Sequence, residues 1–352
     1  MTALIRRRIA QDGPLPISDF MSLALSHPQH GYYPARDPLG AAGDFTTAPE
    51  VHQMFGEVLG LWLAERWQAM GAPRRVVLAE LGPGRGTLMA DALRAVAVAA
   101  PGLHAAAELW LVETSPALRA RQARALSAAA PRWADRVEDL PPGPLLCLAN
   151  EFFDALPIRQ ALRVGGRWRE RCVGMGEDGA LVFGLGRVLP LDIDASEGAM
   201  REECPAAQAV MRLSAERIAA KGGALLALDY GYEAAPREGG DTLQALRRHA
   251  YADPLASPGE ADLTAHVDFG ALSRAAEAAG AQARLATQGA FLERLGITAR
   301  AQALARAAAA RGEEAEAVVA AHRRLTHPAE MGTLFKAFAV TPRGAPAPPG
   351  FA

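Results

Sequence analysis

Cysteine is scarce in this 352-residue chain, and its placement excludes two kinds of stabilising framework. The three cysteines, Cys147, Cys172 and Cys204, lie far apart and have no CxxC spacing. A disulfide scaffold and a cysteine-built zinc site are therefore excluded, and the cysteine usage fits a reducing compartment. The length allows one large domain or two ordinary ones, with a sizeable core in either case.

The chain also lacks an excess of charge and any long apolar run. Its 37 basic and 39 acidic residues leave a formal net charge of −2, whereas a general nucleic-acid binder carries a basic excess. No run of 18 apolar residues occurs, so we expect no transmembrane segment. No apolar stretch of the secretory type follows Arg6, Arg7 and Arg8, and the folded pattern begins almost at once. We therefore expect a cytoplasmic protein that binds no nucleic acid.

Buried strands alternate with helices in the first half of the chain. Short apolar strands are expected at Val76–Ala79, Leu109–Val112 and Leu145–Ala149. Helices are expected from Thr47 to Met70, from Thr87 to about Ala99, and from Ser115 onward. Alternating units of this size indicate a parallel sheet with helices on both faces, which is an α/β fold.

The pattern changes after residue 158. Gly165-Gly166 separates two strand-like segments and predicts a hairpin, so antiparallel strands are expected between about Arg159 and Leu191. Val137 is expected to mark a short strand, and an Ala-rich helical insertion is expected over residues 299–322. The Pro/Gly/Ala-rich segment after residue 341 is expected to be a loose tail.

The most specific local pattern is Glu80-Leu81-Gly82-Pro83-Gly84-Arg85-Gly86, between a predicted strand and a predicted helix. Glycines at such a turn let the backbone take positive φ and pass close to a ligand. The GxGxG spacing differs from the GxGxxG of dinucleotide folds, which disfavours a Rossmann dehydrogenase. Glu80 disfavours an anionic ligand and suits a cationic amino or sulfonium group. The plainer alternative is that the glycines only form a tight turn.

Glu113 follows the second strand and supplies a second carboxylate. A carboxylate at that place can accept hydrogen bonds from both hydroxyls of a ribose. The order of an acid, GxGxG, and a second acid after the next strand points to S-adenosylmethionine. Glu80, Gly82, Gly84, Gly86 and Glu113 are therefore predicted cofactor contacts, together with Asn150 at the end of the third strand.

Asn150-Glu151-Phe152-Phe153-Asp154-Ala155-Leu156-Pro157 follows the third strand. Ligands of open α/β sheets lie at the carboxyl ends of the strands, so this segment is directed at a methyl acceptor. One helical turn would place Glu151 and Asp154 on one side, where two carboxylates can grip a guanidinium. We predict these two residues as catalytic. Alternatively, Asp154 caps a turn and Glu151 pairs with an internal arginine.

The whole pattern resembles the MidA-type methyltransferases, a branch of the class I S-adenosylmethionine-dependent enzymes, from about Pro16 to Val340. The segments that carry the resemblance are Gly31-Tyr32-Tyr33, Gly43–Glu50, Glu80–Gly86, Leu111–Pro116, Asn150–Pro157, Asp229-Tyr230-Gly231, Asp262–Phe269 and Met331–Lys336. The resemblance implies a protein-arginine methyltransferase, because mitochondrial members are complex I assembly factors that methylate an arginine of a core complex I subunit. It implies the same cofactor contacts as the residues themselves, and Glu151 and Asp154 less firmly.

The resemblance also implies an architecture. We expect a class I methyltransferase Rossmann-like sheet with an N-terminal helical cap, inserted antiparallel strands and a C-terminal helical insertion. The predicted divisions are 1–72 for the cap and lid, 73–158 for the cofactor-binding half of the core, 159–222 for the inserted strands and helix, 223–341 for the second half of the core with the helical insertion, and 342–352 for a flexible tail.

Weaker patterns supply further candidates. Asp44 and Phe45 precede the first sheet strand and are predicted cofactor contacts in a lid, with a helix-capping loop as the alternative. Tyr230 ends a strand and is a predicted substrate contact, with a turn as the alternative. His266 is a second predicted substrate contact and could act as a base, although a lone histidine is more often structural. His27 and His30 have no companion that would complete a metal site, so no metal is expected.

The leading hypothesis is therefore a methyltransferase that acts on an arginine side chain of a protein, a complex I subunit being one candidate. A second hypothesis is an assembly chaperone that binds the cofactor and a subunit of a respiratory complex and acts mainly by binding. A third is a small-molecule N- or O-methyltransferase. The added hairpin and helices favour a large acceptor, because a small substrate needs less protein surface around its binding site.

Overall fold

The computed structural model describes residues 1–35, 47–234, 239–247, 250–312 and 315–351 of the chain. It contains two compact units, each built from several chain segments. The first comprises Met1–Phe45, Phe153–Ala209 and Tyr232–Gly270, and the second comprises Thr46–Phe152, Val210–Gly231 and Ala271–Ala352. Among the described residues, no helix is long and apolar enough to cross a membrane.

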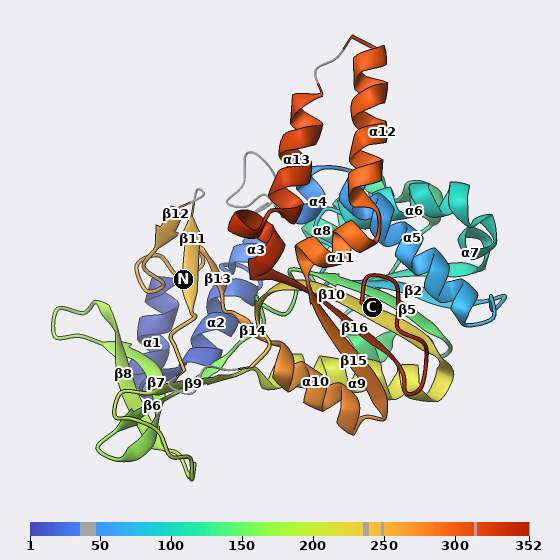
Figure 1. The fold of residues 1–352 in the computed structure, drawn as a ribbon. Coiled ribbons are helices and arrows are strands. Elements are labelled where there is room, and N and C mark those ends of the chain that lie inside the picture. Colours follow the sequence, from blue (N-terminus) through green and yellow to red (C-terminus); the bar gives the residue numbers. More distant parts are fainter. Residues whose placement is uncertain (36–46, 235–238, 248–249, 313–314, 352) are drawn as a thin grey trace. The chain divides into compact units, whose positions relative to one another are not determined.

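The second unit is built on a mixed sheet with strand order β15-β16-β10-β5-β2-β3-β4 (Figure 1). Its strands are β2 (Val76–Leu81), β3 (Ala107–Val112), β4 (Arg132–Ala134), β5 (Leu145–Asn150), β10 (Gly223–Tyr232), β15 (Ala281–Thr287) and β16 (Phe335–Pro342). The strands from β4 to β10 are parallel, and β16 is antiparallel to both of its neighbours. Every residue of β2 and β5 is buried, as expected for strands covered on both faces.

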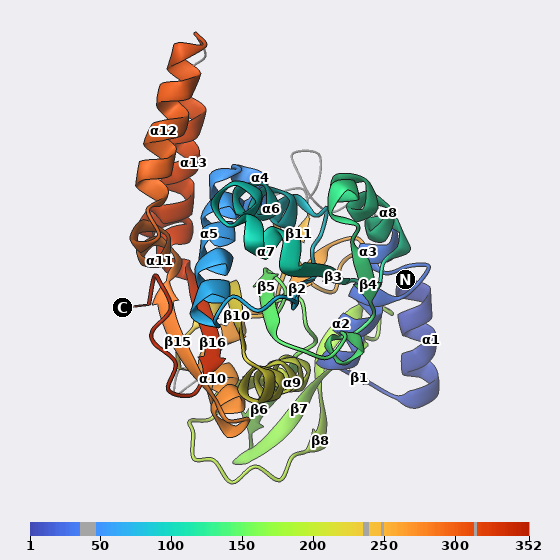
Figure 2. The same ribbon diagram turned by 90° about the vertical axis from the view of Figure 1, so that its right-hand side faces the viewer.

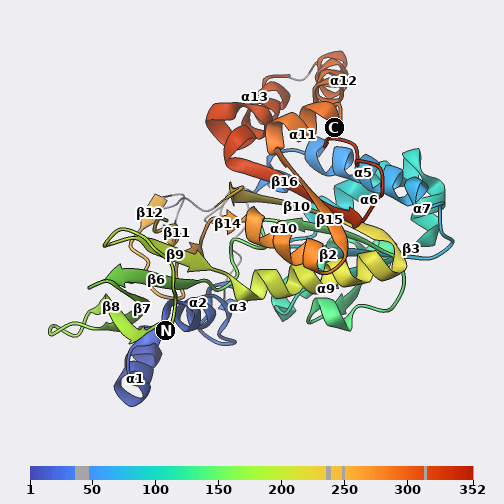
Figure 3. The same ribbon diagram turned by 60° about the horizontal axis from the view of Figure 1, so that its bottom comes forward.

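Helices cover both faces of this sheet. Those near the start are α4 (Ala48–Val51), α5 (Met54–Ala69), α6 (Thr87–Ala99), α7 (Pro101–Ala106) and α8 (Pro116–Ala125). Later in the chain come α9 (Pro205–Lys221) and α10 (Phe269–Ala278), followed by the other helices of the unit, α11 (Gln288–Arg294), α12 (Ile297–Ala310) and α13 (Glu316–Thr326). Figure 3 shows α9 and α10 along one face of the sheet and α5 and α6 along the other. The core on the α5/α6 side includes Phe55, Trp62, Leu78 and Leu148.

The Ala-rich segment predicted as one helical insertion forms two helices, α12 and α13. Figures 1 and 2 both show them side by side as a pair that extends away from the sheet. At the base of this pair, Arg300 of α12 donates two hydrogen bonds to the Glu57 carboxylate of α5, at 2.8 and 2.9 Å. The segment predicted as a loose tail folds back instead, because the Phe351 ring packs 5.0 Å from the Phe291 ring of α11.

The first unit contains helices and small antiparallel sheets. Its helices are α1 (Thr2–Asp12), α2 (Ile17–Ser26) and α3 (Tyr32–Ala35). The small sheets are formed by β1 (Leu15–Pro16), β6 (Arg159–Val164), β7 (Arg167–Met175), β8 (Leu181–Val188) and β9 (Met200–Glu203), and by β11 (Gln244–Arg247), β12 (Ala250–Ala252) and β13 (Asp262–Thr264). The short strand β14 (Val267–Asp268) belongs to neither of them. The β6–β7 hairpin turns at Gly165-Gly166 and confirms the predicted inserted strands.

Two local expectations were wrong. The helix predicted over residues 47–70 is interrupted, because His52 adopts an extended backbone (φ −169°) between α4 and α5. Val137 begins a 3₁₀-helical turn, Val137–Asp139, and the short strand lies earlier as β4. Residues 132–134 form the strand because β4 pairs in parallel with the end of β3, which no pattern within the segment itself reveals.

Candidate functional site

The glycine-rich turn joins β2 to α6 at the carboxyl edge of the sheet. Gly82, Gly84 and Gly86 all have positive φ, at +62°, +53° and +85°. A side chain is strained in this conformation, which explains the glycines. An added Cβ on Gly82 would also lie only 2.9 Å from the Phe152 ring. The turn is therefore a tight, preformed feature of the fold.

Glu80 lies near the end of β2 and is almost completely buried, with 2% of its surface exposed. Its Oε2 atom has no hydrogen-bond partner among the described residues. Burial raises the pKa of this carboxyl from 4.5 to about 8, because the charged form loses its hydration. A buried acid with an unsatisfied oxygen, beside a glycine turn, fits a ligand that brings a hydrogen-bond donor or a positive charge.

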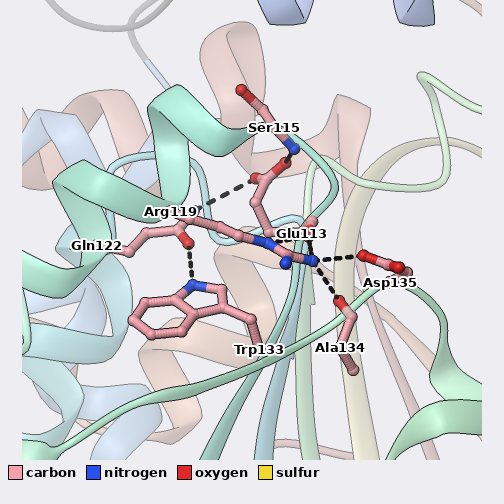
Figure 4. A network of polar contacts seen from close by, with 7 residues as sticks. All are labelled: Glu113, Ser115, Arg119, Gln122, Trp133, Ala134 and Asp135. Atoms are coloured by element: carbon pink, nitrogen blue, oxygen red, sulfur yellow. Dashed lines mark hydrogen bonds and ion pairs between the residues drawn. The ribbon is translucent and has the colours of Figure 1, made fainter. Parts of the chain in front are cut away.

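Glu113 follows β3 and its carboxylate is held at both oxygens (Figure 4). Oε1 accepts the Ser115 N–H at 2.8 Å, and Oε2 accepts a hydrogen bond from Gln122 Nε2 at 3.3 Å. Burial raises the pKa of Glu113, and these hydrogen bonds oppose that shift. The carboxylate is thus fixed in one orientation at the edge of the sheet, as a ribose-binding acid needs to be.

Two residues of α8 that the sequence analysis missed complete this network. Gln122 also donates to the Gly84 carbonyl at 2.8 Å and accepts the Trp133 indole N–H at 2.8 Å. Arg119 donates to the main-chain carbonyl of Glu113 and to Asp135 (Figure 4). Gln122 lies four residues after Leu118, and these two residues are the buried ones of α8, so the helical spacing is the one signal that could have pointed to Gln122.

Asn150 and Glu151 lie at the end of β5, the strand next to β2. The Asn150 side chain is 8% exposed, and its Oδ1 atom has no partner among the described residues. Its Nδ2 donates to Glu151 Oε1 at 3.1 Å. The same oxygen of Glu151 accepts the Ala48 N–H at 3.1 Å, so this carboxylate binds the start of α4. The positive φ of Glu151, +49°, is strained for a residue with a side chain.

Asp229, near the end of β10, holds the segment after β5 in place. It is fully buried, and its Oδ2 accepts the Phe152 N–H at 3.2 Å while Oδ1 accepts the Tyr230 N–H at 3.0 Å. The ring of Tyr230 is buried and packs edge-on against Phe335, with 5.3 Å between the ring centroids. Asp229 belongs to the strand-end segment Asp229-Tyr230-Gly231 that the sequence suggested for the acceptor side, and its observed contacts organise the segment after β5.

The expectation of one helical turn carrying Glu151 and Asp154 was wrong. Residues 151–157 form bends and turns, because the strained backbone at Glu151 and the Asp229 contact direct the chain away from a helical path. The two carboxylates belong to different compact units, since the chain passes from the second unit to the first between Phe152 and Phe153.

In the first unit, the structure places Asp154 and Asp262 close to Tyr33. Both carboxylates are buried, and the Tyr33 hydroxyl donates to Asp262 Oδ1 at 3.0 Å. Burial, followed by the charges of Asp262 and Asp154, raises the pKa of Tyr33 well above 10. The predicted substrate contact His266 is half-buried, and its main-chain N–H donates to Thr242 Oγ1 at 3.0 Å. Asp44 and Phe45 lie outside the described residues.

Comparison with known proteins decides the family. A family profile described as an S-adenosyl-L-methionine-dependent methyltransferase matches residues 58–287. The chain belongs to this methyltransferase family. The match confirms the resemblance found in the sequence. The cofactor of this methyltransferase is S-adenosylmethionine. When bound, this cofactor supplies an electrophilic methyl group on a sulfonium.

Relatives of this methyltransferase extend over nearly its whole length. The mitochondrial protein arginine methyltransferase NDUFAF7 homolog of Drosophila melanogaster is 36% identical over 96% of this chain and 84% of its own. The mitochondrial protein arginine methyltransferase NDUFAF7 of Homo sapiens is 33% identical over 95% of this chain and 82% of its own.

A solved structure confirms the α/β fold. A COG1565 superfamily member from Burkholderia thailandensis, bound to S-adenosyl-homocysteine, has a TM-score of 0.85 and 31% identity to this methyltransferase. The alignment covers 99% of this chain and 93% of that one.

The expected cytoplasmic location is contradicted, because the relatives are named mitochondrial. Scarce cysteine excludes only an oxidising environment and does not distinguish one reducing compartment from another.

Proposed function

We propose that this methyltransferase transfers the methyl group of S-adenosylmethionine to an arginine side chain of a protein. The observation that carries the proposal is the identity of 36% over 96% of the chain to a relative named as a protein arginine methyltransferase. A core subunit of respiratory complex I is the acceptor that we propose on the resemblance to MidA-type enzymes.

The proposed cofactor contacts are the residues that the sequence predicted at the carboxyl edge of the sheet. Glu80 would take the positively charged part of the cofactor, because it is a buried acid with one oxygen that no described residue satisfies. Glu113 would accept hydrogen bonds from the ribose hydroxyls, since its orientation is already fixed. Gly82, Gly84 and Gly86 would let the backbone approach, and Asn150 would contribute its buried amide. Asp44 and Phe45 remain proposed lid contacts.

The proposed acceptor chemistry requires carboxylates, because a guanidinium has a pKa above about 12 and arrives protonated. Carboxylates would orient it, localise its charge and accept a proton. We propose Glu151 and Asp154 for this work, with Asp262 beside Tyr33 as an additional buried acid in the first unit. Tyr230 and His266 remain proposed substrate contacts.

The test is incubation with labelled S-adenosylmethionine and a lysate from a strain that lacks this protein, followed by mass spectrometry. We expect label on an arginine of a protein. Label that appears only in small molecules would overturn the proposed acceptor class. Capture of a respiratory subunit without methylation would favour an assembly chaperone instead.

Site variants test the individual roles. We expect Glu151→Gln and Asp154→Asn to lose methylation while calorimetry still detects cofactor binding. Glu177→Gln, in an exposed turn, is the matched control and should methylate as the wild type does. Full activity of either site variant would show that the role assigned to that residue is wrong.

A further inference from the structure

Gln122 of α8 is a fully buried amide whose polar contacts lead to the proposed cofactor site (Figure 4). Its Nε2 lies 2.8 Å from the carbonyl of Gly84 and 3.3 Å from the carboxylate of Glu113. We propose that Gln122 is a positioning residue, which sets the geometry of the glycine turn and of the ribose-binding acid together. The inference rests on the proposed cofactor contacts of Gly84 and Glu113.

Trp133, next to Gln122, determines which way the amide faces. An indole N–H can only donate, so the atom of Gln122 that meets it at 2.8 Å must be the carbonyl oxygen Oε1. The amide nitrogen Nε2 then necessarily faces Gly84 and Glu113, and each of its two hydrogens has an acceptor. The orientation of Gln122 is thus set by hydrogen-bonding capacity at all three contacts.

This orientation has a consequence for both parts of the site. Glu113 is held at one oxygen by the Ser115 N–H and at the other by Gln122, so its carboxylate cannot turn about its terminal bond without breaking a hydrogen bond. At the turn, Gln122 draws the Gly84 carbonyl toward α8. In a trans peptide the following N–H points the opposite way, so the Arg85 N–H is directed away from α8. A preorganised site avoids the cost of ordering these groups on binding.

The variant Gln122→Glu changes the chemistry with almost no change in shape. It removes both N–H donors and places a second acid beside Glu113, while an oxygen remains for Trp133. We expect the affinity for S-adenosyl-homocysteine, measured by calorimetry at about pH 8, to fall at least tenfold, which is about 1.4 kcal/mol.

A pH profile separates positioning from a general loss of structure. The two acids whose ionisation matters here are Glu113 and the side chain introduced by Gln122→Glu. The charged groups nearest to them are Arg119, which donates to the main-chain carbonyl of Glu113, and its partner Asp135. Two carboxyls in contact hold a shared proton more tightly than one alone, and that proton restores a donor. We therefore expect the affinity of Gln122→Glu to recover relative to wild type as the pH falls from about 8 to about 6.

Two matched controls are available in the chain. Gln288 is equally buried and donates to the Leu325 carbonyl at 2.9 Å, so Gln288→Glu makes the same change outside the network. We expect that variant to lose stability and to keep its cofactor affinity within about twofold.

Trp133→Phe removes the contact that orients Gln122 and should weaken binding of S-adenosyl-homocysteine about threefold. Trp110→Phe should not, because the Trp110 indole N–H has no partner among the described residues.

The variant Glu113→Gln shows whether a negative result overturns the positioning role of Gln122 or the proposed ribose contact of Glu113. If Glu113→Gln binds S-adenosyl-homocysteine as tightly as wild type, the proposed ribose contact is wrong. If Glu113→Gln binds weakly but Gln122→Glu binds like wild type at about pH 8, the positioning role is overturned. Should Gln122→Glu fail to fold, Trp133→Phe decides, and an affinity equal to that of Trp110→Phe overturns the role.

Discussion

Glu80→Gln tests whether the buried acid at the end of β2 is protonated before the cofactor binds. The substitution keeps the shape of the side chain and removes its ability to ionise. In the wild type, burial raises the pKa of Glu80 from 4.5 to about 8. Between these two values, the folded protein keeps the proton that the unfolded chain releases. The stability of the wild type without cofactor should therefore fall as the pH rises through this window.

The size of the effect follows from the two pKa values. At 1.36 kcal/mol per pKa unit, the full difference is roughly 5 kcal/mol, and it is complete above about pH 8. From about pH 5.5 to about pH 7.5, the wild type should lose roughly 2–3 kcal/mol of unfolding free energy through this one group. Below about pH 4.5 both states are protonated and the group contributes nothing.

The assay is urea unfolding of the cofactor-free protein at several pH values across this window. We expect the stability of Glu80→Gln, relative to wild type, to rise by roughly 2–3 kcal/mol between about pH 5.5 and about pH 7.5. Glu108→Gln, on the adjacent strand β3, is the control. Its carboxylate binds Arg75, which lowers the pKa of Glu108, so it does not titrate within this window.

Parallel stability curves for wild type and Glu80→Gln would refute the reasoning. A difference that changes by less than about 0.5 kcal/mol across the window would mean that Glu80 ionises freely in the folded protein. In that case water or a positive group must solvate the Glu80 carboxylate in the folded protein. The proposal that Glu80 binds the cationic part of the cofactor would then lose its support.

Three further predictions follow from other contacts. Gly84→Val should abolish binding of S-adenosyl-homocysteine in calorimetry, because a β-branched residue cannot adopt φ +53°; unchanged affinity would contradict this. Arg300→Ala should lower the unfolding free energy in urea by roughly 1–2 kcal/mol, since buried Glu57 loses a two-pronged partner; a loss under about 0.3 kcal/mol would argue against it. Asp262→Asn should lower the pKa of Tyr33 in a tyrosinate absorbance titration, and an unmoved midpoint would rule out the coupling.

Local patterns were enough to predict the sheet and its functional edge. The strands β2, β3 and β5 were each predicted from a short apolar run, and their ends from the acids that follow. Parallel strands bring their carboxyl ends to one edge, so chain order alone groups Glu80, Glu113 and Asn150 there. The predicted domain divisions and the roles of the individual site residues remain predictions.

Partners that are distant in the sequence could not be predicted in this way. Gln122 hydrogen-bonds to Gly84, 38 residues earlier, and Asp229 to Phe152, 77 residues earlier. Spacing within α8 can mark Gln122 as buried, but no local pattern identifies the partner of Gln122 or of Asp229, because each pairing depends on how α8 and β10 pack beside the turns. The interruption of the helix predicted over residues 47–70 is likewise tertiary, with Glu151 binding the first turn of α4.

The sequence by itself determined the fold class, the cofactor and the family, because glycines with positive φ and acids at strand ends are requirements of the chain's own backbone and chemistry. Only the tertiary structure decided the protonation of Glu80 and the orientation of the Glu113 carboxylate. Burial raises the pKa of Glu80, whose Oε2 atom has no partner among the described residues, and contact with Gln122 and Ser115 fixes Glu113. Solvation and hydrogen bonding depend on everything that surrounds a group, and those surroundings come from segments far apart in the chain.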